Sequence, residues 1–81
     1  MPAMEIRDVL SWNLKHYRRL AGLSQEELAH RADIDRTYIS SIERCLYGVS
    51  IDILDRFAKA LDVTAADLLR EPPADPASDP G

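Results

Sequence analysis

Four polar side chains fall on one face of a helical wheel drawn over residues 36–44: Thr37, Ser40, Ser41 and Arg44. At about 100° per residue, Ile39 and Ile42 lie on the opposite face. Short hydroxyl side chains allow close approach to another surface, and a guanidinium group offers two donors that match O6 and N7 of guanine. A plain solvated helix face would contain the same residue types, so the neighbouring segments must decide between the two interpretations.

The residues that catalyse reactions or bind metals are few and scattered. His16 and His30 lie on different predicted helices and have no cysteine or carboxylate cluster at metal-ligand spacing. Cys45 has no second thiol, and no nucleophile–base pair can be assembled around it. A redox-sensing role for Cys45 is the alternative, but no basic pocket supports it. We therefore expect no enzyme, no metal site and no cofactor.

Two short helical segments joined by a three-residue turn contain the polar face. Ser24 and Glu27 have the spacing of a capping box, in which each side chain binds the backbone N–H of the other residue. Asp35 can cap the second segment in the same way. Ala29 is small enough for the second helix to cross the first closely at a steep angle. This arrangement is typical of a helix-turn-helix, whose second helix can enter the DNA major groove.

Two stretches carry a family resemblance: Leu23-Ser24-Gln25-Glu26-Glu27-Leu28-Ala29 and Tyr38-Ile39-Ser40-Ser41-Ile42-Glu43-Arg44. Together they resemble the phage-repressor and Cro-like helix-turn-helix transcriptional regulators, whose order of segments this chain follows from about Leu14 to Leu69. The run Asp35-Arg36-Thr37-Tyr38-Ile39-Ser40 is also similar to the controller proteins of restriction–modification systems. The resemblance implies a transcriptional regulator that binds specific sequences of double-stranded DNA.

The resemblance also implies how individual residues contact DNA. The base edges in the major groove would be contacted by Arg36, Thr37, Ser40 and Ser41, with Arg36 on a guanine. The phosphate backbone would be contacted by Ser24, Gln25, Tyr38, Arg44, Tyr47 and Ser50. Behind this surface, Arg18 and Glu43 would form an ion pair.

Two positions depart from the pattern of the resembled family, because residues with side chains replace glycine. Asp33 occupies the turn position, where aspartate tolerates the left-handed backbone conformation better than most residues. Cys45 occupies the end of the second helix and makes a less suitable C-cap. The sequence leaves open whether this helix stops near Cys45 or continues for another turn.

The remaining segments predict an all-α fold. A first helix is expected from Ile6 to about Ala21, and its inner face contains Ile6, Leu10, Leu14, Tyr17 and Ala21. Ser50 is expected to cap a fourth helix, and the capping spacing of Thr64 and Asp67 starts a short fifth one. We therefore predict a compact five-helix bundle in which the second and third helices, at about 25–31 and 36–45, form a central helix-turn-helix.

Charge and composition divide the chain into three parts. We expect a frayed lead-in over residues 1–5, a DNA-binding domain with its dimerisation surface over 6–70, and a disordered, acidic, Pro-rich tail over 71–81. The net charge of −4 is unusual for a DNA-binding protein. Four of the fourteen acids (Glu5, Glu71, Asp75 and Asp79) lie in the ends, so residues 6–70 hold ten acids and ten bases.

One recognition helix reads too few base pairs to define a genomic site, so we expect a homodimer on a (pseudo)palindromic operator. Its interface is predicted at the end of the fourth helix and in the fifth: Leu61, Val63, Leu68 and Leu69. RNA polymerase is a further candidate partner. The alternative from another class is a protein-interaction module, either an antitoxin-like protein or a bridging factor. A single cysteine and no apolar run near 20 residues favour a cytoplasmic protein without a membrane partner.

Overall fold

The computed structural model describes residues 5–72, which form five α-helices and no strand. The helices are α1 (Ile6–Leu20), α2 (Gln25–Ala32), α3 (Arg36–Glu43), α4 (Ile51–Leu61) and α5 (Ala65–Leu68). The predicted all-α, five-helix architecture is confirmed. The predicted lead-in and the predicted disordered tail fall almost entirely on residues 1–4 and 73–81, outside the described part of the chain.

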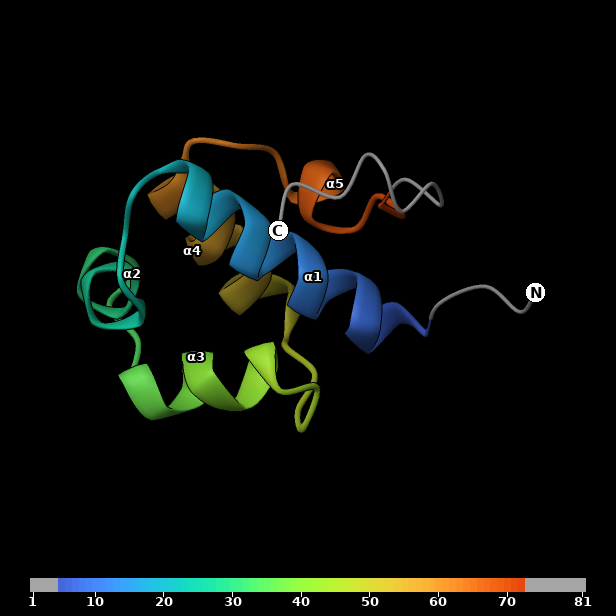
Figure 1. Cartoon of the computed structure of the whole chain (residues 1–81), viewed down its shortest axis with the longest axis horizontal. Coiled ribbons are helices and arrows are strands. Elements are labelled where there is room, and N and C mark those ends of the chain that lie inside the picture. Colours follow the sequence, from blue (N-terminus) through green and yellow to red (C-terminus); the bar gives the residue numbers. More distant parts are fainter. Residues whose placement is uncertain (1–4, 73–81) are drawn as a thin grey trace.

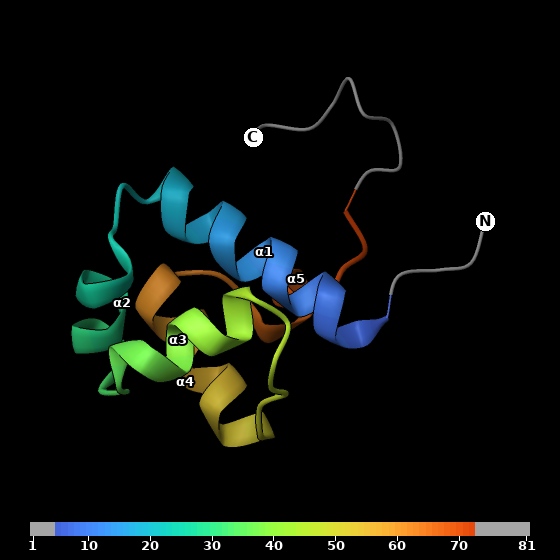
Figure 2. The ribbon, with the colours of Figure 1, turned by 60° about the horizontal axis from the view of Figure 1, so that its bottom comes forward.

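The helices pack so that α1 and α4 lie between α3 on one side and α5 on the other (Figure 1). The α2 helix packs against both α3 and α4, while α1 contacts α3, α4 and α5. As a result, α3 has the protein on one side only, and its other side faces outward (Figure 2). None of the helices in residues 5–72 is long and apolar enough to span a bilayer.

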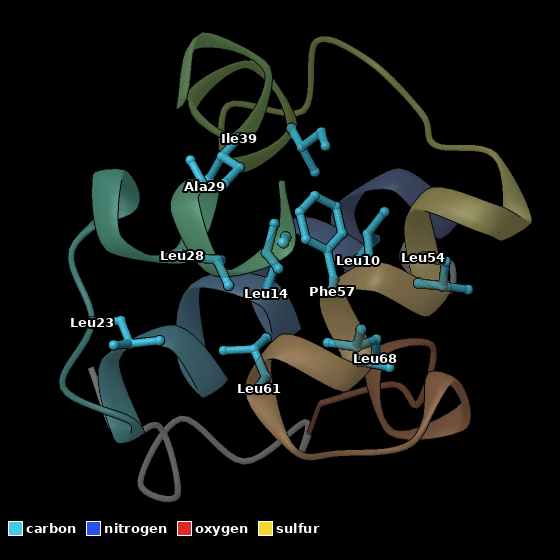
Figure 3. Packing of buried hydrophobic residues seen from close by; sticks show 13 residues of the cluster. Leu10, Leu14, Leu23, Leu28, Ala29, Ile39, Leu54, Phe57, Leu61 and Leu68 are labelled. Atoms are coloured by element: carbon cyan, nitrogen blue, oxygen red, sulfur yellow. The ribbon is translucent and has the colours of Figure 1, made fainter. Parts of the chain in front are cut away.

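The core gathers one apolar stripe from each helix around the fully buried Phe57 of α4 (Figure 3). The α1, α2, α3 and α5 helices contribute the fully buried side chains Leu14, Leu28, Ile39 and Leu68. Burial of a large apolar side chain stabilises a fold by about 1.5–3 kcal/mol, so these five residues account for much of the driving force.

Local hydrogen bonds fix where the helices begin. Ser24 Oγ accepts from the amide of Glu27 and Glu27 Oε1 accepts from the amide of Ser24, both at 3.0 Å, which completes the predicted capping box of α2. Asp35 Oδ1 accepts from the Thr37 amide at 2.8 Å at the start of α3. Ser50 caps α4, and Thr64 with Asp67 forms a second capping box at α5. These contacts satisfy backbone N–H groups that have no partner within their helix.

Left-handed residues mark where four of the helices end, the first being Gly22 after α1, with φ 72°. Asp33 has φ 57° and Cys45 has φ 62°, at the two positions where glycine is usual in the resembled family. Asp62 adopts φ 57° after α4. The question of where α3 stops is thereby answered: the helix ends at Glu43, and the chain reverses through Arg44 and Cys45. The three-residue turn at 33–35 agrees with the prediction.

The inner face of α1 differs from the prediction. Val9 is 2% exposed, whereas Ile6, the first residue of the helix, lies beyond the end of the bundle and is 60% exposed. Two polar residues of α1 are also buried, Ser11 toward α3 and Asn13 toward α5, at 5% and 4% exposure. Their burial is tolerated because each side chain donates to backbone carbonyl groups, Ser11 to the end of α3 and Asn13 to the end of α5.

Two residues of the predicted dimer surface belong instead to the core of the monomer. Leu61 is 8% exposed and Leu68 is 0% exposed, so neither can contact a second copy of the chain. The reason is that α5 has only four residues and uses Leu68 to pack against α1 and α4. Val63 is half-buried and Leu69 is 40% exposed, so these two remain available.

Candidate nucleic-acid interface

The outward side of α3 is polar and is supported from below by apolar residues. Arg36, Thr37 and the helix-end residue Arg44 are exposed, and Ser40 is half-buried. Directly opposite them, Ile39 and Ile42 are 0% and 1% exposed within the core. The α3 helix therefore presents hydroxyl and guanidinium groups on a rigid support.

Ser41 is a correction to the predicted base-reading set. Its side chain is 6% exposed, and its hydroxyl donates to the carbonyl oxygen of Thr37 at 2.9 Å. The outward side of α3 is centred near Ser40, which leaves Ser41 on the flank next to the buried Ile42. The candidate base-reading residues that remain are Arg36, Thr37 and Ser40.

The predicted phosphate-binding hydroxyls differ in whether their hydrogen is free to donate. Ser24 and Ser50 act as acceptors in their caps, so each hydroxyl hydrogen remains available to a phosphate. The Tyr38 hydroxyl instead donates to the carbonyl oxygen of Gly48 at 3.2 Å, which connects α3 to the following loop. Tyr38 therefore shapes the surface, while Tyr47, 58% exposed, presents its ring to solvent.

Glu43 joins three helices immediately behind the polar side of α3. Its carboxylate accepts from Arg18 of α1 at 2.7 and 3.0 Å, in the ion pair that the family resemblance implies. Gln25 of α2 donates to the same carboxylate at 3.1 Å. The backbone carbonyl of Glu43 accepts from the Ser11 hydroxyl at 2.7 Å. Because Gln25 is held here through one N–H, its second amide hydrogen is the one left for a phosphate.

Ser11 and Asn13 are structural residues that the sequence analysis missed. Asn13 Nδ2 donates to the carbonyl oxygens of Leu68 at 2.9 Å and Arg70 at 2.7 Å, which fastens the C-terminal end of α5 to α1. The sequence contained one signal, since both polar residues stand within an otherwise apolar stretch of α1, from Val9 to Leu14. That signal did not identify their partners, which are 32 to 57 residues away.

Several acidic side chains form helix caps, whereas two arginines at the ends of α3 have no acidic partner within the described part of the chain. Hydrogen bonds from the backbone and then the hydroxyl of Ser24 lower the pKa of Glu27, and those of Thr64 act in the same way on the pKa of Asp67. By contrast, Arg36 and Arg44 form no ion pair with any residue in the range 5–72. In the same range, no three His, Cys, Asp or Glu side chains come together as a metal site.

Comparison with known proteins agrees with this geometry. A helix-turn-helix family matches residues 14–68. A hypothetical transcription factor of Neisseria meningitidis is 40% identical over 68 residues, which are 84% of this chain and 64% of that relative. The control protein C.SmaI of Serratia marcescens is 41% identical over 66 residues, 82% of this chain and 79% of that protein.

Solved structures of such proteins have the same fold. The crystal structure of the Neisseria factor superimposes with a TM-score of 0.82 at 38% identity and covers 89% of this chain and 88% of that one. The structure of the biofilm regulator SinR in complex with DNA gives a TM-score of 0.73 at 39% identity, over 75% of this chain and 98% of that one.

Figure 1 shows α2 nearly end-on and α3 lying across the view, so the two helices cross steeply. With the three-residue turn between them, they define a helix-turn-helix protein. The chain belongs to the helix-turn-helix family of transcription regulators, and its relatives include controller proteins of restriction–modification systems.

Proposed function

We propose that this protein is a transcription regulator that binds a specific (pseudo)palindromic DNA operator as a homodimer. The observation that carries the proposal is the outward side of α3, where Arg36, Thr37 and Ser40 project from a helix whose opposite side is sealed in the core. An α-helix of this kind fits the major groove, where each base pair shows a distinct pattern of donors and acceptors.

In this function the side chains of α3 read bases and the ends of the neighbouring helices hold phosphates. Arg36 donates to O6 and N7 of a guanine, a contact worth about 1–3 kcal/mol of discrimination against other bases. The first amides of α2 and the Ser24 hydroxyl bind one phosphate, because a helix N-terminus is a natural anion site. Arg44 and Tyr47 bind the backbone beyond the far end of α3.

The homodimer follows from the size of the site that one helix can read. Two copies related by a twofold axis would place their α3 helices on half-sites about 34 Å apart. Val63, which is half-buried, and Leu69, which is 40% exposed, supply apolar surface beside and after α5. The α5 helix lies on the opposite side of the bundle from α3 (Figure 1). In the cytoplasm, the bound dimer would affect transcription according to where its operator lies relative to RNA polymerase.

A second candidate is a protein-interaction module on the same scaffold. It is favoured by three exposed apolar side chains in and after the α3–α4 loop: Leu46 at 53%, Tyr47 at 58% and Ile51 at 80% exposure. Exposed large apolar side chains within six residues of sequence offer apolar surface that a protein partner could cover.

Selection from a random DNA pool followed by titration distinguishes the two candidates. A regulator yields a two-fold symmetric sequence that binds at least about a thousand times more tightly than scrambled duplex, with two chains bound per site. Its affinity falls steeply with salt because bound counterions are released from the phosphates. If selection enriches no sequence, the DNA-binding proposal is rejected and the protein-interaction function takes its place.

A further inference from the structure

Arg7, in the first turn of α1, lies against the loop that follows α3. A Cβ atom placed on Gly48 would be 3.5 Å from Arg7 Nε and 4.0 Å from Nη2, so the guanidinium group rests beside the loop backbone. Figure 2 shows the start of α1 next to this loop. The arginine is exposed, and it forms no ion pair with any residue between 5 and 72.

The direction of Arg7 follows from the packing of α1. Arg7, Ser11 and Arg18 share one side of the helix, at spacings of four and seven residues. Ser11 and Arg18 on this side both bind Glu43, the last residue of α3. Arg7 continues the same line by one turn, past the end of α3, and so reaches the α3–α4 loop.

Three donors therefore lie in or beside the segment that follows α3: the guanidinium groups of Arg7 and Arg44 and the hydroxyl of Tyr47. Arg44 and Tyr47 are both exposed, and the hydroxyl of Tyr47 makes no hydrogen bond within the described residues. An edge that carries two guanidinium groups and no acid in contact is suited to an anion. Directly after a DNA-reading helix, that anion is a backbone phosphate.

We propose that Arg7 binds a DNA phosphate on the outer flank of each half-site, so that α1 takes part in DNA binding from outside the helix-turn-helix. This inference rests on the proposed function and adds a contact to it. Since phosphates are present at every sequence, Arg7 contributes affinity and not base preference.

The test compares Arg7→Ala with Arg19→Ala, using the sequence selected by the wild-type protein and a scrambled duplex. Arg19 lies on the same helix, is exposed and forms no ion pair within residues 5–72, but it points to another side of α1. For Arg7→Ala we expect about tenfold weaker binding to both duplexes. The slope of log affinity against log salt concentration should be smaller in magnitude by about 0.9 per half-site. Arg19→Ala should leave both values unchanged, and Arg7→Lys should retain the slope.

Ethylation interference identifies the phosphate itself. One flanking phosphate in each half-site should block wild-type binding when ethylated and lose that effect in Arg7→Ala. Equal behaviour of Arg7→Ala and Arg19→Ala, or an unchanged interference pattern, overturns the inference while the regulator function stands. A wild-type protein that prefers no sequence overturns both. Circular dichroism melting checks that Arg7→Ala is folded. We expect it to be, because the Arg7 side chain donates no hydrogen bond to residues 5–72.

Discussion

Arg18 and Glu43 form a two-point ion pair, with Arg18 Nε 2.7 Å from Oε2 and Nη2 3.0 Å from Oε1 of Glu43. The side chains are only 12% and 3% exposed. Arg18 also donates through Nη1 to the carbonyl of Leu23, at the turn between α1 and α2. One guanidinium group thus connects α1 both to the beginning of α2 and to the end of α3.

Arg18→Met should strongly destabilise the fold. Removal of one partner leaves the Glu43 carboxylate buried without its counter-charge, which costs about 3–5 kcal/mol. The measurement is the free energy of unfolding in urea. Lys59→Met is the matched control, since it breaks an exposed pair with Asp55 whose side chains are 78% and 56% exposed, and such pairs contribute about 0.3–0.5 kcal/mol. Equal losses of unfolding free energy in the two variants would show that the Arg18–Glu43 pair stabilises the fold no more than an exposed pair does.

Arg36→Ala and Arg44→Ala should weaken DNA binding in different ways. Under the proposed function Arg36→Ala removes a base contact, so we expect a loss of about 1–3 kcal/mol of binding free energy on the selected sequence and relaxed preference at one position. Arg44→Ala removes the proposed phosphate contact, so it should weaken binding to all sequences alike and reduce the slope of log affinity against log salt concentration by about one. Parallel gel-shift titrations on selected and scrambled duplexes measure both effects. If Arg36→Ala loses the same binding affinity on both duplexes, Arg36 does not contact a base.

Glu27→Gln should remove a pH-dependent part of the stability. The hydrogen bonds from Ser24 lower the pKa of Glu27 in the folded protein, so the native state favours the ionised carboxylate. This contribution is present above the ordinary glutamate pKa and is lost as the pH falls through the lower, folded-state value. The wild-type protein should therefore be more stable than Glu27→Gln at neutral pH, and the difference should disappear in acid.

The control for this experiment is Glu26→Gln, which removes the same charge from the same turn of α2. Glu26 makes no capping hydrogen bond to the residues of the described chain, so its substitution should leave the acid dependence of unfolding nearly as in the wild type. A pH profile of Glu27→Gln that runs parallel to that of the wild type would contradict the predicted role of the capping box.

Leu69→Asp should separate the two copies of the proposed dimer without unfolding the chain. Leu69 is 40% exposed, and a charge at a dimer interface is costly when it is buried. Sedimentation equilibrium at high micromolar concentration should give a dimer for the wild type and a monomer for Leu69→Asp, with similar melting temperatures. Leu68→Ala should instead lower stability by about 2–5 kcal/mol, because Leu68 is fully buried in the monomer. A monomeric wild type would remove the basis of the dimer proposal.

Cys45→Gly should stabilise the protein. Cys45 adopts φ 62°, a left-handed conformation that costs a residue with a side chain about 1–2 kcal/mol relative to glycine. Part of that gain is offset by the greater freedom of glycine in the unfolded chain, so we expect a net increase of about 0.5–1 kcal/mol in thermal or urea unfolding. Cys45→Ala keeps the Cβ atom and should give no such gain. An equal gain in both variants would point to the thiol and not to the backbone.

The parts of this structure that the sequence predicted are those set by local chemistry. Capping side chains three residues apart mark the starts of α2 and α5, and an apolar stripe marks α4. The family resemblance added the Arg18–Glu43 pair, whose partners lie 25 residues apart and share no local pattern.

What the sequence could not supply was the rotation of each helix against its neighbours. The helical wheel placed Ser41 beside Thr37 and Arg44, but the packing of α3 turned Ser41 toward the core, where it is 6% exposed. The partners of Asn13 and the burial of Leu68 depend on how α5 packs onto α1, which is a long-range property. Surplus leucines near the end of a chain fit a dimer interface and a monomer core equally well.

The side chains of Arg36, Thr37 and Ser40 donate no hydrogen bond to the rest of residues 5–72 and belong to no buried cluster. The scaffold that holds them is built from other residues, chiefly the Glu43 junction and the two isoleucines beneath α3. If the proposed function holds, a new operator preference can be engineered by exchanging these three side chains, since they make no contact that holds the described helices together. Duplicated copies of such a gene could acquire different targets by the same route while the bundle stays unaltered.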